Sequence, residues 1–354
     1  MPNSLPNPNL AALSAVIIIA ALTIYLLIVG EAIFVPLVLA IFIAYLIIAL
    51  AHALEIPRLW GRHLHPGLAM TAAIIIFMLV IAVLVQLVAG NIRAVVDAAP
   101  QYQTRLEGVL TDTNRVLAAT FHQRAPITLA KVLNQIDLQT IFERIASAFR
   151  SIAGNTFQIL IYVAFLLLEV RTFDRKLASM FPDNHRERAI RATLHQIGRK
   201  IETYVWIKTA VSLMAGLLSY AVLASIGVDF APFWALLLFI LNFIPYLGPV
   251  IGVLFPTLLA LLQFGSLATF LLVFAVLAGV QALIGNVIEP RLTGKSLNIS
   301  PLVMMVGLSV WGSIWGITGM ILSVPIMVMA MIVLAQFPRT RALAILMSES
   351  GDIH

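Results

Sequence analysis

Residues 232–262 read PFWALLLFILNFIPYLGPVIGVLFPTLLALL, an uncharged stretch with helix-breaking residues at its centre. As one helix this stretch would be about 46 Å long at 1.5 Å per residue, too long for one level crossing of a bilayer and too short for two. Pro245, Gly248 and Pro249 lie near its middle, where they favour two half-helices that meet at an unwound turn. The stretch therefore predicts a broken helical hairpin in a membrane protein.

The rest of the chain also predicts a bilayer as its solvent. Its 354 residues are 61% hydrophobic and 11% charged, with a mean hydropathy of +1.01, so one water-soluble core could not bury its apolar surface. Seven stretches without charged residues or histidine predict helices, because backbone groups in lipid must bond within their own segment. They are residues 10–30, 32–51, 66–92, 151–168, 209–228, 230–288 and 296–338.

The predicted fold is an all-α, polytopic membrane protein with two broken or re-entrant helical hairpins and an amphipathic helical extramembrane segment. Residues 171–200 set its orientation, because they hold eight basic residues against three acidic ones and basic loops remain in the cytoplasm. Counting spans from this segment places both termini in the cytoplasm. The expected parts are three N-terminal spans in 1–92, an extracytoplasmic segment in 93–150, a fourth span with the basic segment in 151–205, a transport core in 206–338 and a tail in 339–354.

Residues 93–150 are polar, but apolar residues recur in them at helical spacing. A first run ends at Phe121, and Pro126 separates it from a second. Asp137 is expected to cap a third run that leads into the fourth span. Such amphipathic helices can pack on one another, lie on the membrane surface or contact a neighbouring subunit.

Residues 300–337 repeat the pattern of a broken helix. The stretch begins near Pro301 and is interrupted by Gly312, Gly316 and Gly319. Small residues four positions apart let two helical limbs approach closely. Glycine and proline are common in membrane helices generally, but two interrupted apolar segments in one chain of transporter size point to a binding site.

A topology follows if both broken segments return to the side from which they enter. The loop with Arg291 and Lys295 then lies in the cytoplasm together with Arg339, in agreement with the positive-inside rule. The breaks at 245–249 and 312–319 are then expected to approach each other near the membrane midplane and to line the pathway.

Polar residues inside apolar spans are costly and are therefore candidates for that pathway. Asn242 could bind a cation or a solute hydroxyl, or satisfy backbone groups freed by Pro245. Gln281, Asn286 and Glu289 are expected to lie within one polar arc of a helix. The candidate pathway residues are Asn242, Pro245, Gly248, Pro249, Gln281, Asn286, Glu289, Gly312, Gly316 and Gly319.

Glu289 is the charged candidate, because it is the single carboxylate between Asp229 and the C-terminal tail. A coupling role competes with an interfacial cap or salt bridge, since Pro290 and Arg291 adjoin it.

Other polar residues at span edges are expected to be structural. Glu31 is expected in a short turn after Gly30, and Glu169 is expected to act with Arg171 as an interfacial anchor. Tyr204 and Lys208, four positions apart, are expected to stack as a cation–π pair that lets the lysine reach the cytoplasmic boundary.

Three segments resemble the autoinducer-2 exporter family, also called PerM-like permeases. They are NFIPYLGPVIG at 242–252, NVIEPRLTGKSLNISP at 286–301 and WGITGMILSVP at 315–325. The motifs cover about 200–338 and the hydropathy layout covers the rest, although 93–150 carry nothing recognisable. The resemblance implies a bacterial inner-membrane transporter that forms a homo-oligomer. Members have been linked to export of the furanone autoinducer-2 and, in others, to sodium or lithium extrusion in exchange for protons.

Transport of a small solute or monovalent cation across a lipid bilayer is therefore the predicted function, and a non-transporting membrane assembly protein is the alternative from another class. An enzyme is not expected, because His63 and His65 have no third metal ligand nearby and the chain has no Walker loop. No cofactor is expected. The net charge of +6 does not predict nucleic-acid binding, because the basic residues cluster at span ends.

Overall fold

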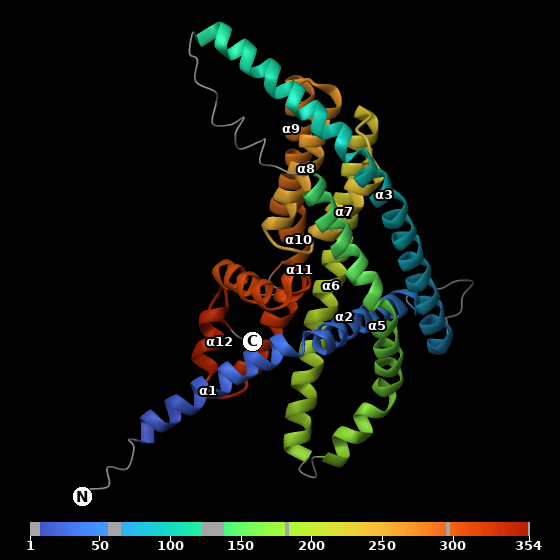
Figure 1. Ribbon diagram of the computed structural model, residues 1–354. Helices are drawn as coiled ribbons and strands as arrows, with labels where there is room; N and C mark the ends of the chain where they lie inside the picture. The colour runs from blue at the N-terminus through green and yellow to red at the C-terminus, as the bar shows by residue number, and fades with distance from the viewer. Residues whose placement is uncertain (1–7, 56–64, 122–137, 181–183, 295–297, 353–354) are drawn as a thin grey trace, which may run out of the picture. The chain divides into compact units, whose positions relative to one another are not determined.

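The computed structural model describes residues 8–55, 65–121, 138–180, 184–294 and 298–352, which are helical apart from short turns and one isolated bridge. Six helices in these ranges are long and apolar enough to cross a membrane (Figure 1). They are Glu31–Glu55, Pro66–Leu87, Glu187–Ile226, Leu247–Phe264, Leu267–Thr293 and Pro301–Ala335. The predicted all-α, multi-pass fold is thus confirmed.

The chain divides into two compact units, each assembled from separate stretches of sequence. Unit 1 comprises Met1–Tyr45, Phe157–Ile201 and Asn298–His354, and unit 2 comprises Leu46–Thr156 and Glu202–Leu297. The helices α2, α5 and α6 each contribute to both units.

In unit 1, helices α1 (Pro8–Val29) and α2 (Glu31–Glu55) follow one another without a reversal of the chain. The N–H of Gly30 donates to the carbonyl of Leu26 at 2.8 Å, and the N–H of Phe34 donates to the carbonyl of Gly30 at 2.9 Å. This i to i+4 pattern is that of an α-helix. The first of these bonds ends α1 and the second opens α2, so Gly30 is a one-residue turn between the two helices and Glu31 begins α2 directly after it.

Helix α11 (Pro301–Ala335) is a hairpin of two helical limbs. The chain leaves helical geometry at Trp315 (φ −126°, ψ 20°) and at Gly316 (φ 58°, ψ −141°), a conformation that favours glycine. Beyond this point the limbs pack closely, because a Cβ atom at Gly319 would lie 1.9 Å from the carbonyl oxygen of Trp311. The predicted break is present, and it is confined to two residues. Helix α12 (Arg341–Met347) packs on α11.

Helix α3 (Pro66–Phe121) runs through the expected boundary at residues 92 and 93. The third span and the first amphipathic run are therefore one continuous helix, with Pro100 inside it. Helix α5 (Leu138–Met180) likewise joins the third run to the fourth span. Pro126, the second run and the proposed cap at Asp137 lie outside the described residues.

In unit 2, α6 (Asn184–Ile226) leads to α7 (Ala231–Leu241) and α8 (Leu247–Phe264), which pack on each other as a hairpin. A Cβ atom at Gly248 would lie 1.8 Å from the carbonyl oxygen of Leu241, so only glycine permits this approach. The rings of Trp234 and Phe255 stack between the two limbs, 6.3 Å apart. The predicted break in 232–262 is thus an unwound turn between two helices.

Helix α9 (Leu267–Leu283) begins at Ser266, whose hydroxyl accepts a hydrogen bond from the N–H of Thr269. It continues into a π-helix, η1 (Ile284–Ile288), and then into α10 (Glu289–Thr293). A π-helical turn inside an α-helix is rare and frequently marks a functional site. Figure 1 shows α8 beside α9, and the two helices pack on each other.

Candidate functional site

One face of α6 carries polar side chains into the apolar interior of unit 2. Tyr204, Lys208, Ser212 and Ser219 recur three to four positions or multiples apart, which places them on one side of a helix. They are between 0% and 6% exposed. We call these four residues the α6 polar strip.

The α6 polar strip lies against the segment formed by α9, η1 and α10. Val211 and Ala215, on the same face of α6, pack with Ile284 in one buried cluster. Lys208 contacts Glu289 further along, so residue numbers rise on one segment as they fall on the other. The two segments are therefore antiparallel, and this register brings the start of the family-like motif, up to Glu289, next to α6.

The ammonium of Lys208 lies 2.5 Å from Oε1 of Glu289 and donates a hydrogen bond to it. The lysine side chain is 7% exposed and the glutamate side chain 28%. Two sequence predictions are corrected by this contact. The salt-bridge partner of Glu289 is Lys208 and not Arg291, and the ammonium lies on a carboxylate instead of on the ring of Tyr204. Opposite charge in an apolar environment outweighs the weaker cation–π attraction.

Asn242 joins the turn of the α7–α8 hairpin to the strip. Its Nδ2 donates a hydrogen bond of 3.0 Å to the hydroxyl oxygen of Ser212, and the two residues are 2% and 0% exposed. The amide thus holds α6 against the unwound turn. Sequence reasoning offered a cargo ligand or a partner for freed backbone groups, and neither alternative named Ser212.

Several buried polar atoms near this strip have no hydrogen-bond partner among the described residues. They are Nε2 of Gln281 and the hydroxyl oxygens of Tyr204, Thr209 and Ser219. Gln281 lies in α9 one turn before the Ile284 cluster and is 8% exposed. An unpaired polar group in an apolar interior costs free energy comparable to a lost hydrogen bond, so each such group needs an explanation.

The polar arc predicted for the motif region is only partly formed. Gln281 is buried and Glu289 is half-buried against Lys208, but Asn286 is exposed. Asn286 lies within η1, whose i to i+5 bonding places one more residue in the turn than an α-helix does. In this turn the N–H of Glu289 bonds to the carbonyl of Ile284, so Glu289 lies over the buried Ile284, whereas Asn286 is on the exposed side.

The glycines and prolines of the two breaks have structural tasks. Gly248 permits the close approach of α7 and α8, and Gly319 permits that of the α11 limbs. Gly312 contacts Met320 of the opposite limb, and Gly316 makes the turn through its positive φ. Pro245 lies within the turn of the first hairpin, and Pro249 lies in the first helical turn of α8. Gly312, Gly316 and Gly319 belong to unit 1, whereas the other candidates belong to unit 2.

The tip of the α11 hairpin is docked on α1 within unit 1. The indole N–H of Trp315 donates a hydrogen bond of 3.0 Å to the carbonyl of Leu27, and Trp315 is 4% exposed. The bond fixes the position of the turn at Gly316.

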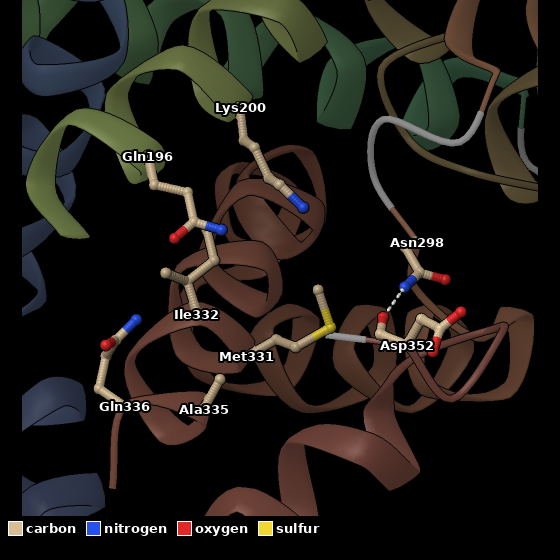
Figure 2. A pocket seen from close by; sticks show the side chains of 8 residues that line it. All are labelled: Gln196, Lys200, Asn298, Met331, Ile332, Ala335, Gln336 and Asp352. Carbon is tan, nitrogen blue, oxygen red and sulfur yellow. Dashed lines mark hydrogen bonds between the residues drawn. The ribbon is translucent and has the colours of Figure 1, made fainter. Parts of the chain in front are cut away.

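A small hollow in unit 1 lies between α6, α11 and the C-terminal residues (Figure 2). Polar side chains surround an apolar floor, and Nδ2 of Asn298 donates to the carbonyl of Asp352 at 2.5 Å. Sequence reasoning did not find this hollow, because its walls come from distant segments. The lining residues are Gln196, Lys200, Asn298, Met331, Ile332, Ala335, Gln336 and Asp352.

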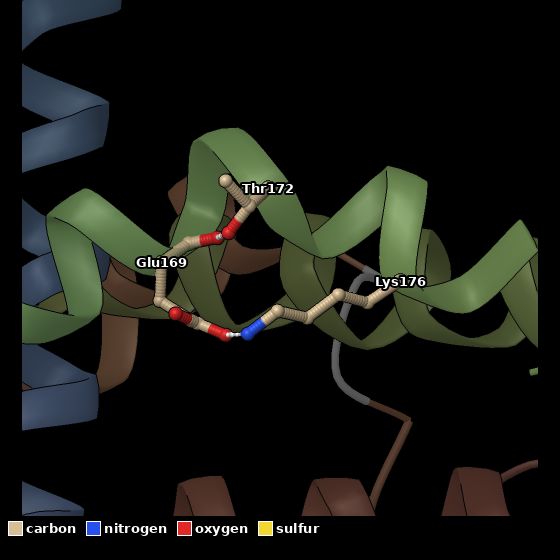
Figure 3. Close-up of polar contacts among 3 residues, drawn as sticks. All are labelled: Glu169, Thr172 and Lys176. Carbon is tan, nitrogen blue, oxygen red and sulfur yellow. Dashed lines mark hydrogen bonds and ion pairs between the residues drawn. The ribbon is translucent and has the colours of Figure 1, made fainter. Parts of the chain in front are cut away.

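Glu169 provides a contrasting ion pair on the surface of α5. Its carboxylate binds the ammonium of Lys176, two turns further along the same helix, and its carbonyl accepts from the hydroxyl of Thr172 (Figure 3). The two charged side chains are 49% and 59% exposed. Glu169 thus pairs with Lys176, and the side chain of Arg171, which the prediction named, lies outside the described residues.

Comparison with known proteins agrees with the motifs on α7–α8, on η1–α10 and on α11. The chain matches the family described as AI-2E family transporter over residues 15–339. The AI-2 transport protein TqsA of Escherichia coli (strain K12) is 29% identical over 320 residues, which cover 90% of each chain. A Borreliella burgdorferi protein named only for transport is 33% identical over 248 residues, 69% of this chain and 66% of the relative.

A third relative, YhhT of Escherichia coli (strain K12), is also named for transport and is 27% identical over 323 residues, 91% of this chain and 90% of the relative. The family match spans most of the sequence and includes both hairpins and the Lys208–Glu289 contact. The resemblance seen in the sequence is thereby confirmed. This multi-pass membrane protein is a transporter and belongs to the AI-2E transporter family.

Proposed function

We propose that the protein exports a small hydrogen-bonding solute across the bacterial inner membrane, and that the solute passes along the α6 polar strip. The observation that carries this proposal is a set of buried polar atoms that have no partner in the described part of the chain, on Tyr204, Thr209, Ser219 and Gln281. Their desolvation is costly in a static protein. The cost is offset if cargo or water binds them during transport.

The chemistry of these groups indicates the class of cargo. Gln281 offers an amide, and Tyr204 and Ser219 offer hydroxyls, so the groups can donate and accept hydrogen bonds without adding charge. They complement a small neutral molecule with several hydroxyl groups. The relative TqsA is named for transport of AI-2, and a cargo of this kind is our proposal for the present chain.

Flux from reconstituted vesicles tests the proposal. Vesicles that contain the purified protein are loaded with autoinducer-2, and efflux is compared with that from protein-free vesicles. Efflux without a dependence on the protein would refute export of this cargo.

A pair of variants tests the route. Gln281→Leu removes the unpaired amide and retains the side-chain bulk, so we expect folded protein with efflux reduced about tenfold, equivalent to 1.4 kcal/mol. The matched control is Gln158→Leu in α5, whose amide donates to the hydroxyl of Tyr162 at 3.0 Å. Equal efflux from the two variants would show that the cargo does not pass along the α6 polar strip.

Sodium or lithium exchange for protons is the second candidate function, and the buried Lys208–Glu289 pair supports it. A transporter without an ATPase motif must use a gradient or run downhill, and ion-coupled cycles need an intramembrane charge. Glu289→Gln keeps the side-chain shape but removes the charge. We expect this variant to lose the sodium and pH dependence of flux. If the dependence of flux on sodium and pH were unchanged, the pair would have only a structural role and passive export would be favoured.

A further inference from the structure

We propose that the Glu289 carboxylate is a binding site for one small monovalent cation, and that the ammonium of Lys208 is the tethered occupant of this site in the present conformation. The inference rests on the proposed transport function only for the role that the site would have in a transport cycle. The binding itself is measurable without transport.

Burial of the pair is not explained by stability alone. Taking two charges out of water costs much of what their attraction returns, and apolar residues in place of a buried ion pair are often as stable or more so. Lys208 is 7% exposed, in a stretch of α6 that otherwise continues into uncharged sequence. An ion pair at such a position points to a task that apolar side chains could not perform.

The two partners differ in their access to water. The side chain of Glu289 is 28% exposed and that of Lys208 is 7% exposed, so an ion from water reaches the carboxylate more readily than the ammonium. Glu289 also begins α10 directly after η1, where the helical hydrogen bonds change register. The acidic partner therefore lies on the less regular and more accessible segment.

Two buried hydroxyl groups lie on α6 one helical turn before and one turn after Lys208. The hydroxyl of Tyr204 lies one helical turn before Lys208, is buried, and has no hydrogen-bond partner among the described residues. The hydroxyl oxygen of Ser212, which accepts the hydrogen bond of Asn242, lies one turn after Lys208 and is also buried. Carboxylate and hydroxyl oxygens are the ligands that hard cations prefer.

Charge balance determines the number of ions. One ammonium carries one positive charge, so its departure leaves one uncompensated carboxylate in an apolar environment. Lysine has a flexible four-carbon stem and can release its partner by rotation. One monovalent cation then neutralises the carboxylate, as it would in Lys208→Gln, whereas a divalent cation would leave an excess positive charge there.

The experiment removes the tethered ammonium and measures cation binding by thermal unfolding. Lys208→Gln is purified as the full chain in detergent and unfolded in sodium, lithium, potassium or choline chloride at equal ionic strength. We expect its Tm to rise by about 2 °C or more in at least one alkali chloride relative to choline chloride when the salt is in tenfold excess over the Kd. Wild-type protein should show a smaller alkali-specific rise, because Lys208 occupies the site.

Two controls separate site binding from general salt effects. The double variant Lys208→Gln/Glu289→Gln lacks the carboxylate and should unfold at the same Tm in alkali and choline chloride. Lys176→Gln frees the exposed Glu169 of Figure 3, and water already solvates that carboxylate. It should show no alkali-specific rise.

An equal Tm of Lys208→Gln in all four salts would overturn the proposal. If this variant is recovered from membranes only in an alkali chloride, the requirement for a replacement cation is supported. If it is lost in every salt while the double variant is recovered, no cation replaces the ammonium and the proposal is overturned. None of these outcomes depends on autoinducer-2 efflux, so failure of the cation site and failure of the export function are distinguishable.

Discussion

The phenol of Tyr102 donates a 2.6 Å hydrogen bond to Oδ2 of Asp229, 127 positions along the chain. Asp229 precedes α7, and its N–H donates to Oε1 of Gln263 near the end of α8 at 2.8 Å. Arg105 donates to the carbonyl of Gln263 at 3.2 Å, and its guanidinium lies 5.9 Å from the ring centroid of Tyr102. These four residues, the Tyr102 clamp, fasten α3 to the base of the α7–α8 hairpin.

Tyr102→Phe should weaken the clamp without changing its packing. The variant loses one hydrogen bond to a charged group, worth about 1 to 3 kcal/mol, and should unfold a few degrees below the wild type. Tyr220→Phe is the control, because Tyr220 is 44% exposed on α6. Thermal unfolding in detergent measures both variants, and equal Tm values would show that the clamp does not stabilise the fold.

The stability of the clamp should depend on alkaline pH. Burial of the phenol and its hydrogen bond to Asp229 raise the pKa of Tyr102 above its ordinary value. The folded protein therefore holds this proton more tightly than the unfolded chain, so the contribution is full below about pH 10 and is lost as the pH rises further. Between about pH 9 and pH 11 the Tm of the wild type should fall more steeply than that of Tyr102→Phe. Parallel curves would contradict the coupling.

Gly248→Ala should disrupt the α7–α8 hairpin, because the added Cβ would lie 1.8 Å from the carbonyl oxygen of Leu241. We expect little or no folded protein by fluorescence-detected size exclusion. Gly279→Ala in α9 is the matched control, since its Cβ would meet no atom within 4 Å. Alanine is the better helix former there, so this variant should be at least as stable as the wild type. A folded Gly248→Ala protein with a normal Tm would refute the close approach.

Trp315→Phe should loosen the tip of the α11 hairpin, because it removes the indole N–H that binds the carbonyl of Leu27. A lost hydrogen bond of this kind costs about 1 kcal/mol, or a few degrees in Tm. Trp311→Phe provides the comparison, because the ring centroids of Trp311 and Trp315 are 5.1 Å apart and each variant loses the same aromatic area. The larger loss is expected for Trp315→Phe, and the reverse order would argue against the docking of the tip.

The proposed topology places the loop before α11 and the end of α11 in the cytoplasm. The chain has no cysteine, so Lys295→Cys and Arg339→Cys each introduce a single reactive site. An impermeant thiol reagent should label neither variant in intact cells and both in inverted vesicles. Labelling of Lys295→Cys from outside would contradict two hairpins that each return to their own side.

Local chemistry alone was sufficient to predict the membrane class and the places where helices break. Long uncharged stretches must form helices in lipid, and this requirement does not depend on tertiary partners. Pro245 and Gly316 act on their own backbone, so the breaks near them were readable from the sequence. The continuity of α3 across residues 92 and 93 could not be predicted from the sequence. A helix that leaves the membrane changes its composition without changing its hydrogen bonds.

The partners of polar residues were decided only by the tertiary structure. Lys208 and Glu289 are 81 positions apart, and their contact depends on the antiparallel register of α6 with α9, η1 and α10. Asn286 lies at the surface, although the sequence predicted it within one polar arc with Gln281 and Glu289. A sequence determines which residues need a partner in an apolar solvent, because desolvation is a property of each residue. The register between helices determines which residue becomes that partner, and the packing of the whole unit sets the register.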